Sequence, residues 1–269
     1  MKRPSPRVAV TVPLGGHPEL SPDEEISLRH LRHYLGRYDR FVIAPRSMEV
    51  PHEDFEIVRF DDEYFGSANA QTRLMMRPEY YEAFSDYEYI LTYQLDALVL
   101  SDQLLEWCSS GLDFIGAPNY GLSDELSVVC SGGFALRRVQ SFLAVLRSDR
   151  YAIDPDEYWH RLTAEMDPWA KLWNLPRKYL KRFHRFNGID REIEWFLRDS
   201  GVLLEDEFFV RRARTFYPDF RLPSVETALR FAFDETPRVA FEMAGRRLPF
   251  GVHAWYKQDR QFWEPFLLV

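Results

Sequence analysis

The stretch YILTYQLDALVLSD, residues 89–102, indicates a buried strand with an acid at its end. It begins as a run of apolar, aromatic and β-branched residues, which is typical of a buried strand. Asp96 interrupts the run, and four more apolar residues follow it. Ligands of open α/β sheets bind outside the carboxyl ends of the strands, so Asp96 can project into a binding crevice. The alternative is an Asp that caps a turn.

Strand and helix patterns alternate around this stretch. Three short β-rich runs precede it, and a helix with a Ser21–Glu24 capping box lies between the first two runs; the runs are 7–13, 39–45 and 55–60. A helix over 69–84 is expected to be interrupted near Pro78. Beyond the stretch, the pattern predicts a strand at 113–118 and then a strand, a Gly-Gly turn and a helix over 127–146. This order predicts an α/β fold with a mostly parallel sheet.

Composition excludes several classes of protein. The chain has 269 residues, 46% hydrophobic and 28% charged, which suits one large α/β domain or two small ones. A formal net charge of −8 argues against a nucleic-acid partner. Cys108 and Cys130 have no CxxC spacing, so neither a disulfide scaffold nor a zinc cage is expected. The sequence has no signal-peptide pattern and no membrane-spanning run, which predicts a cytoplasmic protein.

Two further segments carry chemistry that would fit Asp96. PFGVHAWYK contains His253, a potential nitrogen ligand, and Lys257, a point charge suited to a diphosphate. CSGGFALR contains Gly132 and Gly133, where a backbone without side chains could approach a ligand. The plainer interpretations are a packed, hydrogen-bonded histidine and a tight turn.

The Asp96 stretch with its extension to Pro118, then SGGFALR, then PFGVHAWYKQDRQFW resemble, in that order, a GT-A-type glycosyltransferase-like family catalogued as domain of unknown function 5672. The resemblance covers about 7–266. It implies a GT-A-like, Rossmann-like mixed sheet, mostly parallel and flanked by helices, in a single domain over 1–269. Within that domain it implies a nucleotide-binding half over about 7–118, an acceptor-side half over about 119–269, and a basic aromatic insertion over about 151–188.

The resemblance also implies a reaction. GT-A enzymes hold a divalent cation with an Asp-x-Asp motif, and the matching triplet here is Gln94-Leu95-Asp96. Asp96 and His253 would then be metal ligands for Mn²⁺ or Mg²⁺, and Lys257 would contact the leaving diphosphate. Gln94 departs from the motif because it brings no charge, which puts tight metal dependence in doubt. The expected activity is transfer of a sugar from a nucleotide-sugar, a UDP-sugar by preference, to a glycan or lipid-linked acceptor.

An inverting transferase needs a carboxylate base for the acceptor hydroxyl, and a retaining one does not. GIDREIEWF offers Glu192, slightly favoured, and Asp190. Both could instead be acids that favour the dipole of a helix's first turn.

The nucleotide is expected over the end of the first strand, near Thr11, Val12 and Pro13, with Asn69 and Arg73 reaching the base or phosphates. Arg73 could equally pair with a surface acid.

The segment 171–186 stands apart because it holds six Lys or Arg, no acid and several aromatic residues. It could contact an anionic membrane surface, cover the donor diphosphate as a basic lid, or be a solvated helix packed on the domain. Contact with a membrane would place the protein at its inner face. Pro176 is expected to break any single long helix here.

Two other functions compete with sugar transfer. One is a catalytically inert GT-A-like module that binds a glycan or a partner protein, with Gln94 as a sign of decay. The other is a nucleotidyltransferase, whose lysine-containing, Gly-rich phosphate loop has no match in PLGGHPEL.

Overall fold

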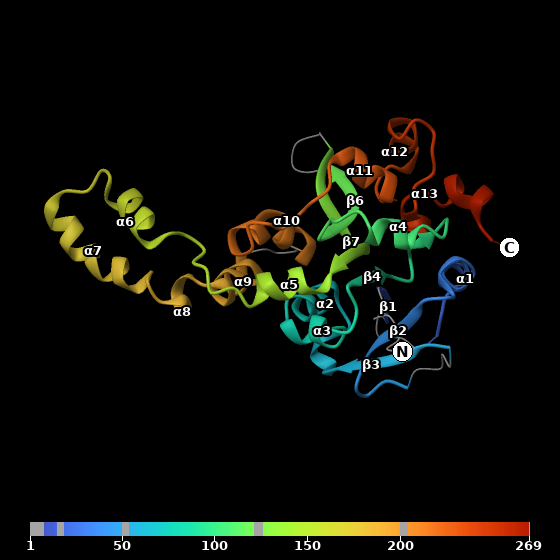
Figure 1. Ribbon diagram of the computed structural model, residues 1–269, viewed down its shortest axis with the longest axis horizontal. Helices are drawn as coiled ribbons and strands as arrows, with labels where there is room; N and C mark the ends of the chain where they lie inside the picture. Colours follow the sequence, from blue (N-terminus) through green and yellow to red (C-terminus); the bar gives the residue numbers. More distant parts are fainter. Residues whose placement is uncertain (1–7, 15–18, 50–53, 121–125, 200–203, 269) are drawn as a thin grey trace, which may run out of the picture.

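The structure is a computed structural model that describes residues 8–14, 19–49, 54–120, 126–199 and 204–268. Its centre is a six-stranded sheet with the order β3-β2-β1-β4-β7-β6 (Figure 1). The strands are β1 Val8–Pro13, β2 Asp39–Pro45, β3 Glu56–Phe60, β4 Tyr89–Tyr93, β6 Phe114–Tyr120 and β7 Leu126–Arg138. The first four are mutually parallel, and β7 pairs antiparallel with both β4 and β6. The predicted mixed, mostly parallel α/β sheet in a single domain is confirmed.

The alternating directions of the side chains along β1 explain why helices cover both faces of the sheet. Val10 packs with Leu31 of α1 (Pro22–Leu35) in one core cluster. Its neighbour Ala9 belongs to a second cluster with Tyr81 of α3 (Pro78–Glu82) and Phe142 of α5 (Val139–Leu146). Successive strand residues point to opposite faces, so an uninterrupted apolar strand needs a helix layer on each side.

A second, three-stranded sheet brings distant segments together. Its strands are β5 Leu98–Val99, β9 Gly251–Val252 and β8 Ala232–Phe233, in that order across the sheet. Since β5 pairs antiparallel with β9, the chain just before β5 meets the chain just after β9. Asp96 and His253 therefore approach each other although they are far apart in sequence.

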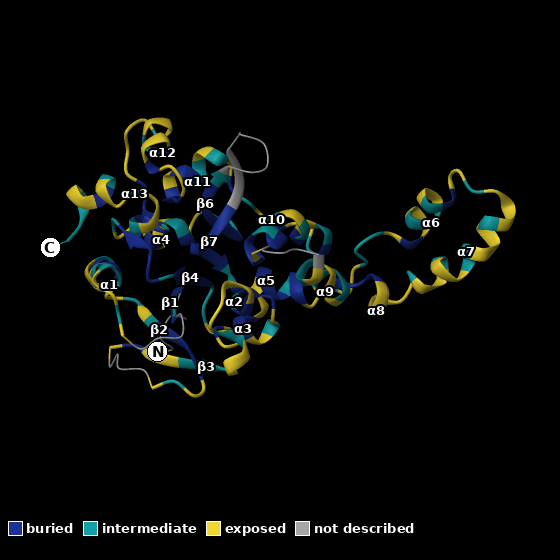
Figure 2. Cartoon of the chain, turned by 180° about the vertical axis from the view of Figure 1, so that it is seen from behind, coloured by how far each residue is buried: buried dark blue, intermediate teal, exposed yellow. Residues whose placement is uncertain are grey.

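The remaining helices surround these sheets. They are α2 Ala68–Met75, α4 Leu104–Cys108, α6 Pro155–Thr163, α7 Pro168–Leu180, α8 His184–Asn187, α9 Ile189–Asp199, α10 Glu205–Phe216, α11 Val225–Phe231, α12 Pro237–Met243 and α13 Trp255–Trp263, with 3-10 turns η1 Asp62–Tyr64 and η2 Glu264–Phe266. Helices α6, α7 and α8 form an arm that projects from the body (Figures 1 and 2). Among the described residues, no helix combines the length and apolar character needed to cross a bilayer.

The predictions of helix caps, helix breaks and turns were partly right. The Ser21–Glu24 capping box is present, and the chain is interrupted before Pro78, where α3 begins. The predicted Gly-Gly turn was wrong, because β7 continues through Gly132 and Gly133. The predicted break at Pro176 was also wrong, because α7 runs through it. Pro176 is exposed, so water can hydrate the carbonyl that loses its N–H partner there.

Candidate functional site

A cavity of about 340 Å³ opens at the carboxyl ends of the parallel strands. It lies where the strand order reverses, since β2 and β3 lie on one side of β1 and β4 on the other. Such a switch point is where open α/β sheets bind ligands. The chain just after β1 and β4, the turn before α2, and α13 supply much of its wall, including Pro13, Leu14, Tyr64, Phe65, Gly66, Ser67, Gln71, Gln94, Asp96, Tyr256 and Lys257.

Asp96 is the buried acid at the rim of this cavity, with only 6% of its surface exposed. Lys257 Nζ donates to Asp96 Oδ2 at 2.7 Å. The second carboxylate oxygen, Oδ1, is buried and has no hydrogen-bond partner among the described residues. It lies 3.5 Å from His253 Nε2. Burial lowers the pKa of Lys257, but the hydrogen bond and charge of Asp96 outweigh it, so that pKa is raised.

His253 is held from both ring nitrogens. Its Nδ1 lies 3.0 Å from Asp234 Oδ2 and 3.0 Å from Ser131 Oγ, and its Nε2 lies 3.1 Å from Gln94 Oε1. Burial lowers the pKa of His253, but Asp234 and then Asp96 more than offset this, so the pKa is raised. Asp234 follows β8 directly, just as Asp96 follows β4, and fixes the ring so that Nε2 faces Gln94 and Asp96.

These donors fit a divalent cation. An imidazole nitrogen, an amide oxygen and an unpartnered carboxylate oxygen converge, with His253 Nε2 at 3.1 Å from Gln94 Oε1 and 3.5 Å from Asp96 Oδ1. Adjacent ligands of an octahedral ion lie roughly 3 Å apart when each is about 2.1 Å from the metal. Within the described ranges, no group of three His, Cys, Asp or Glu side chains forms a metal cluster. A cation would therefore rely on Gln94 and on oxygens of a ligand.

Gly133 of β7 is required by this arrangement. A Cβ atom there would lie 2.1 Å from His253 Nε2 and 2.7 Å from Gln94 Oε1. The glycine thus gives the imidazole its space, which is a different use from the predicted turn or backbone contact with a ligand.

We expect Gly133→Ala to displace His253 and to lower the free energy of unfolding by about 1–3 kcal/mol, because overpacking forces side chains from their preferred rotamers. Thermal unfolding and nucleotide binding, measured together, check this. Gly245→Ala is the control, because its φ of +65° makes the substitution strained although nothing lies within 4 Å. That control should lose stability without losing binding. Equal loss of binding in both variants would contradict the assignment.

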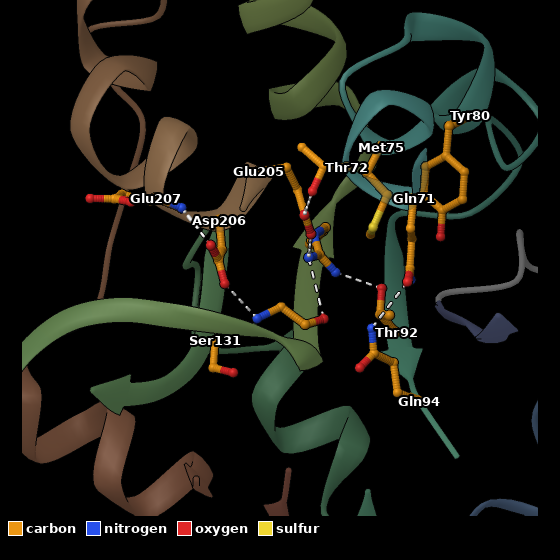
Figure 3. A network of polar contacts seen from close by, with 12 residues as sticks. Gln71, Thr72, Met75, Tyr80, Thr92, Gln94, Ser131, Glu205, Asp206 and Glu207 are labelled. Atoms are coloured by element: carbon orange, nitrogen blue, oxygen red, sulfur yellow. Dashed lines mark hydrogen bonds and ion pairs between the residues drawn. The ribbon is translucent and has the colours of Figure 1, made fainter. Parts of the chain in front are cut away.

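A buried acid pair, Glu205 and Asp206, begins α10 (Figure 3). Asp206 Oδ2 accepts from the Gly132 N–H at 2.9 Å, and Oδ1 accepts from the Glu207 N–H at 2.7 Å. Burial, and then the charge of Glu205, raise the pKa of Asp206 to about 7. A carboxyl group with such a pKa can accept a proton near neutral pH.

Glu205 has a structural partner that Asp206 lacks. Arg137, fully buried, donates to Glu205 Oε1 at 2.9 Å and to Thr92 Oγ1 (Figure 3). A buried arginine is costly unless paired, so Glu205 compensates its charge. The two carboxylate oxygens of Asp206 instead accept from the backbone N–H groups of Gly132 and Glu207.

The predicted nucleotide contacts are only partly brought to the cavity. Pro13 lines it, whereas Thr11 and Val12 are buried within the sheet. Asn69 and Arg73 are exposed and are not among the lining residues, and Arg73 donates to the Glu63 carbonyl at 3.0 Å. Positions two apart on a helix point in different directions, so α2 presents Gln71 to the cavity instead. Gln71 Oε1 accepts from Gln94 Nε2 at 3.4 Å.

The predicted bases are not brought to Asp96. Glu192 forms an ion pair with Arg212 at 2.8 Å and lines a separate cavity of about 250 Å³ beside Trp195. No residue of that cavity lines the one at Asp96. Asp190 is exposed on α9.

Sequence reasoning missed Asp206, Asp234, Ser131 and Gln71. Asp234 carried a signal similar to that of Asp96, an acid directly after the mostly apolar run ALRFAF. Asp206 carried a weaker signal, a Glu-Asp pair before Phe208 and Phe209. The burial of this acid pair depends on Arg137, which lies far away in the sequence.

Comparisons with known proteins give a family and a distant structural likeness. A family described as "Protein of unknown function (DUF5672)" matches residues 54–253. No curated protein matches the chain. The solved glycosyltransferase GlyE of Streptococcus pneumoniae TIGR4 is 12% identical with a TM-score of 0.41, over 98% of this chain and 60% of that one. Its apo form is 13% identical with a TM-score of 0.38, over 97% of this chain and 59% of that one. This chain thus spans about 60% of the GlyE chain.

Proposed function

For this chain, which belongs to the DUF5672 family of proteins of unknown function, we propose transfer of a sugar from a nucleotide-sugar donor, of the uridine diphosphate class, to a glycan or lipid-linked acceptor. The observation that carries the proposal is the convergence of Asp96, His253 and Lys257 at the rim of the switch-point cavity. One carboxylate, one imidazole and one ammonium at that place suit a diphosphate and its counter-ion.

The cavity suits the rest of the donor. Its volume of about 340 Å³ lies in the range of small-molecule sites. Tyr64 and Phe65 supply aromatic surface for a base at the α2 side, and Gln71 supplies an amide. Lys257 lies at the Asp96 side, where its charge would stabilise the leaving diphosphate.

A divalent cation, Mn²⁺ or Mg²⁺, would be held by Asp96, His253 and Gln94, and when bound it would neutralise charge on the diphosphate. Asp234 and Ser131 orient the imidazole that receives it. Lys257, whose ammonium already contacts Asp96, shares this neutralising role.

Asp206 is the proposed base. It is hydrogen-bonded to Gly132, the neighbour of the glycine that contacts His253, so the acid and the donor site contact adjoining residues of β7. A pKa near 7 suits removal of a proton from an acceptor hydroxyl as the sugar departs from the diphosphate.

A thermal-shift screen tests the donor class directly. Nucleoside diphosphates and nucleotide-sugars are each added with and without Mn²⁺, and release of nucleoside diphosphate is then measured for those that bind. Ligand at a hundred times its Kd stabilises a protein by about 2.7 kcal/mol, which raises Tm by several degrees. Stabilisation by UDP-sugars with slow UDP release supports the proposal. Binding without any release supports the inert module, which the uncharged Gln94 favours, and no binding refutes both.

A further inference from the structure

Helix α7 in the projecting arm presents an apolar stripe to solvent. At 100° per residue, its large apolar side chains fall within about a third of the helix circumference. They are strongly exposed, with Trp173 at 84% and Trp169 at 74%, and the stripe continues through Leu172, Tyr179 and Leu180. Figure 2 shows α7 exposed along much of its length, and none of its residues is buried.

The opposite side of α7 packs on α6. Lys178 lies over the Trp159 ring at 5.7 Å and pairs with Asp156 at 3.7 Å. Lys181 lies over the Tyr158 ring at 5.1 Å. A helix in a globular protein usually turns its apolar stripe inward. Here the polar side is turned inward and the tryptophans outward, so this orientation is fixed by the contacts with α6.

Basic residues flank the stripe. Lys171 and Arg177 lie on α7 and Arg185 on α8, and all three are exposed. From 168 to 187 the sequence contains no acid, whereas the whole chain has a formal net charge of −8. Helices α7 and α8 therefore concentrate positive charge beside exposed tryptophan in an otherwise acidic protein, whereas α6 contributes Asp156, which pairs with Lys178 and Arg182.

We propose that α7 is a membrane-surface helix that lies in the interface of a bilayer rich in anionic lipids. Tryptophan and leucine on one side and lysine and arginine at its edges are the features of such helices, since tryptophan favours the headgroup level and the cations attract acidic lipids. The exposed basic residues beside the stripe favour a lipid surface over a second copy of the chain as the partner, because a protein interface is depleted of charge around its apolar centre. The proposal does not depend on sugar transfer.

The test is co-sedimentation of the whole protein with vesicles of phosphatidylcholine alone, or with about a third phosphatidylserine. We expect binding to the anionic vesicles, with a blue shift of tryptophan fluorescence, and weakening at high salt because the charges are screened. Trp169→Ser with Trp173→Ser should lower the partition coefficient at least about tenfold. Lys171→Gln, Arg177→Gln and Arg185→Gln together should lower it on the order of a hundredfold.

Matched controls distinguish binding through this surface from nonspecific hydrophobic binding. Val239 and Met243 are an exposed apolar pair on α12 with the same spacing as the two tryptophans. Replacing both with Ser should leave vesicle binding unchanged, and circular dichroism checks that each variant folds. No binding by the unaltered protein, or equal binding to neutral vesicles, overturns the proposal. So does a dimer in lipid-free solution that the tryptophan replacements dissociate, since that assigns the stripe to a second copy.

Discussion

Asp206→Asn is expected to reduce turnover by a factor on the order of 10²–10⁴ while leaving donor binding nearly unchanged. The amide keeps the size of the side chain and can still accept one of the two backbone N–H groups that Asp206 now engages, from Gly132 and Glu207. It cannot accept a proton, which removes general-base catalysis. UDP release and donor affinity, measured on the same preparation, separate the chemical step from binding.

The same variant should alter two pH profiles. In the unaltered protein, the rate should rise with pH through about 7 as Asp206 ionises, and the variant should lack this rise. Because burial raises the pKa of folded Asp206 from 3.8 to about 7, the folded state holds this proton more tightly than the unfolded state. The resulting stability is complete below pH 3.8 and is lost as pH rises through 7. Unfolding of the Asn variant should lack that pH dependence.

Glu192→Gln and Asp190→Asn are the matched comparisons, since both acids were predicted as the base from sequence. Glu192 pairs with Arg212 beside a separate cavity and Asp190 is exposed on α9, whereas Asp206 is hydrogen-bonded to Gly132 next to the glycine that contacts His253, so both variants should keep full turnover. Turnover that is lost in Glu192→Gln and retained in Asp206→Asn would reverse the assignment.

Asp96→Asn is expected to lower cation-stimulated UDP release by a factor of about 10³ and to weaken donor binding. The substitution removes the negative charge that faces His253 and Lys257, and loss of a cation's contribution amounts to several kcal/mol. Stability should change little, because the Lys257 side chain is 58% exposed and its charge can be solvated. Titration with Mn²⁺ during the assay reports both effects.

Asp102→Asn provides the control for Asp96→Asn. Asp102 ends the same stretch of sequence but pairs with Arg37 on the surface at 3.0 Å. Its replacement should affect neither cation dependence nor donor binding. If Asp96→Asn responds to Mn²⁺ as the unaltered protein does, then Asp96 is not a ligand, and Lys257 alone neutralises the diphosphate.

The sequence predicted the structure correctly where a local pattern of residues determines it. The apolar strand before Asp96 could be placed because buried parallel strands leave a continuous apolar run. The capping box at Ser21 could be placed because both partners lie within one helical turn. Asp96, His253 and Lys257 were singled out from their residue types and places in the sequence, the family resemblance gave them roles, and the structure brings His253 and Lys257 to Asp96.

Sequence was not informative where long-range packing decided the outcome. Gly132 and Gly133 looked like a turn, but they lie within β7, where Glu205 and His253 leave no room for a Cβ atom. Asp206 was missed from the sequence. Its altered pKa results from burial against β7 and from Glu205, whose own position depends on Arg137. No sequence window contains these partners together.

The pairing of β5 with β9 has a consequence for biosynthesis. Asp96 and Lys257 are separated by 161 positions, and the pairing of β5 with β9, together with the hydrogen bond from the Trp255 N–H to the Asp96 carbonyl, holds them close. A ribosome completes the large sheet well before it reaches the codon for Lys257. A nascent chain, or a product of premature termination between these points, would therefore contain the parallel strands without Lys257, and the proposed donor site would be incomplete until release.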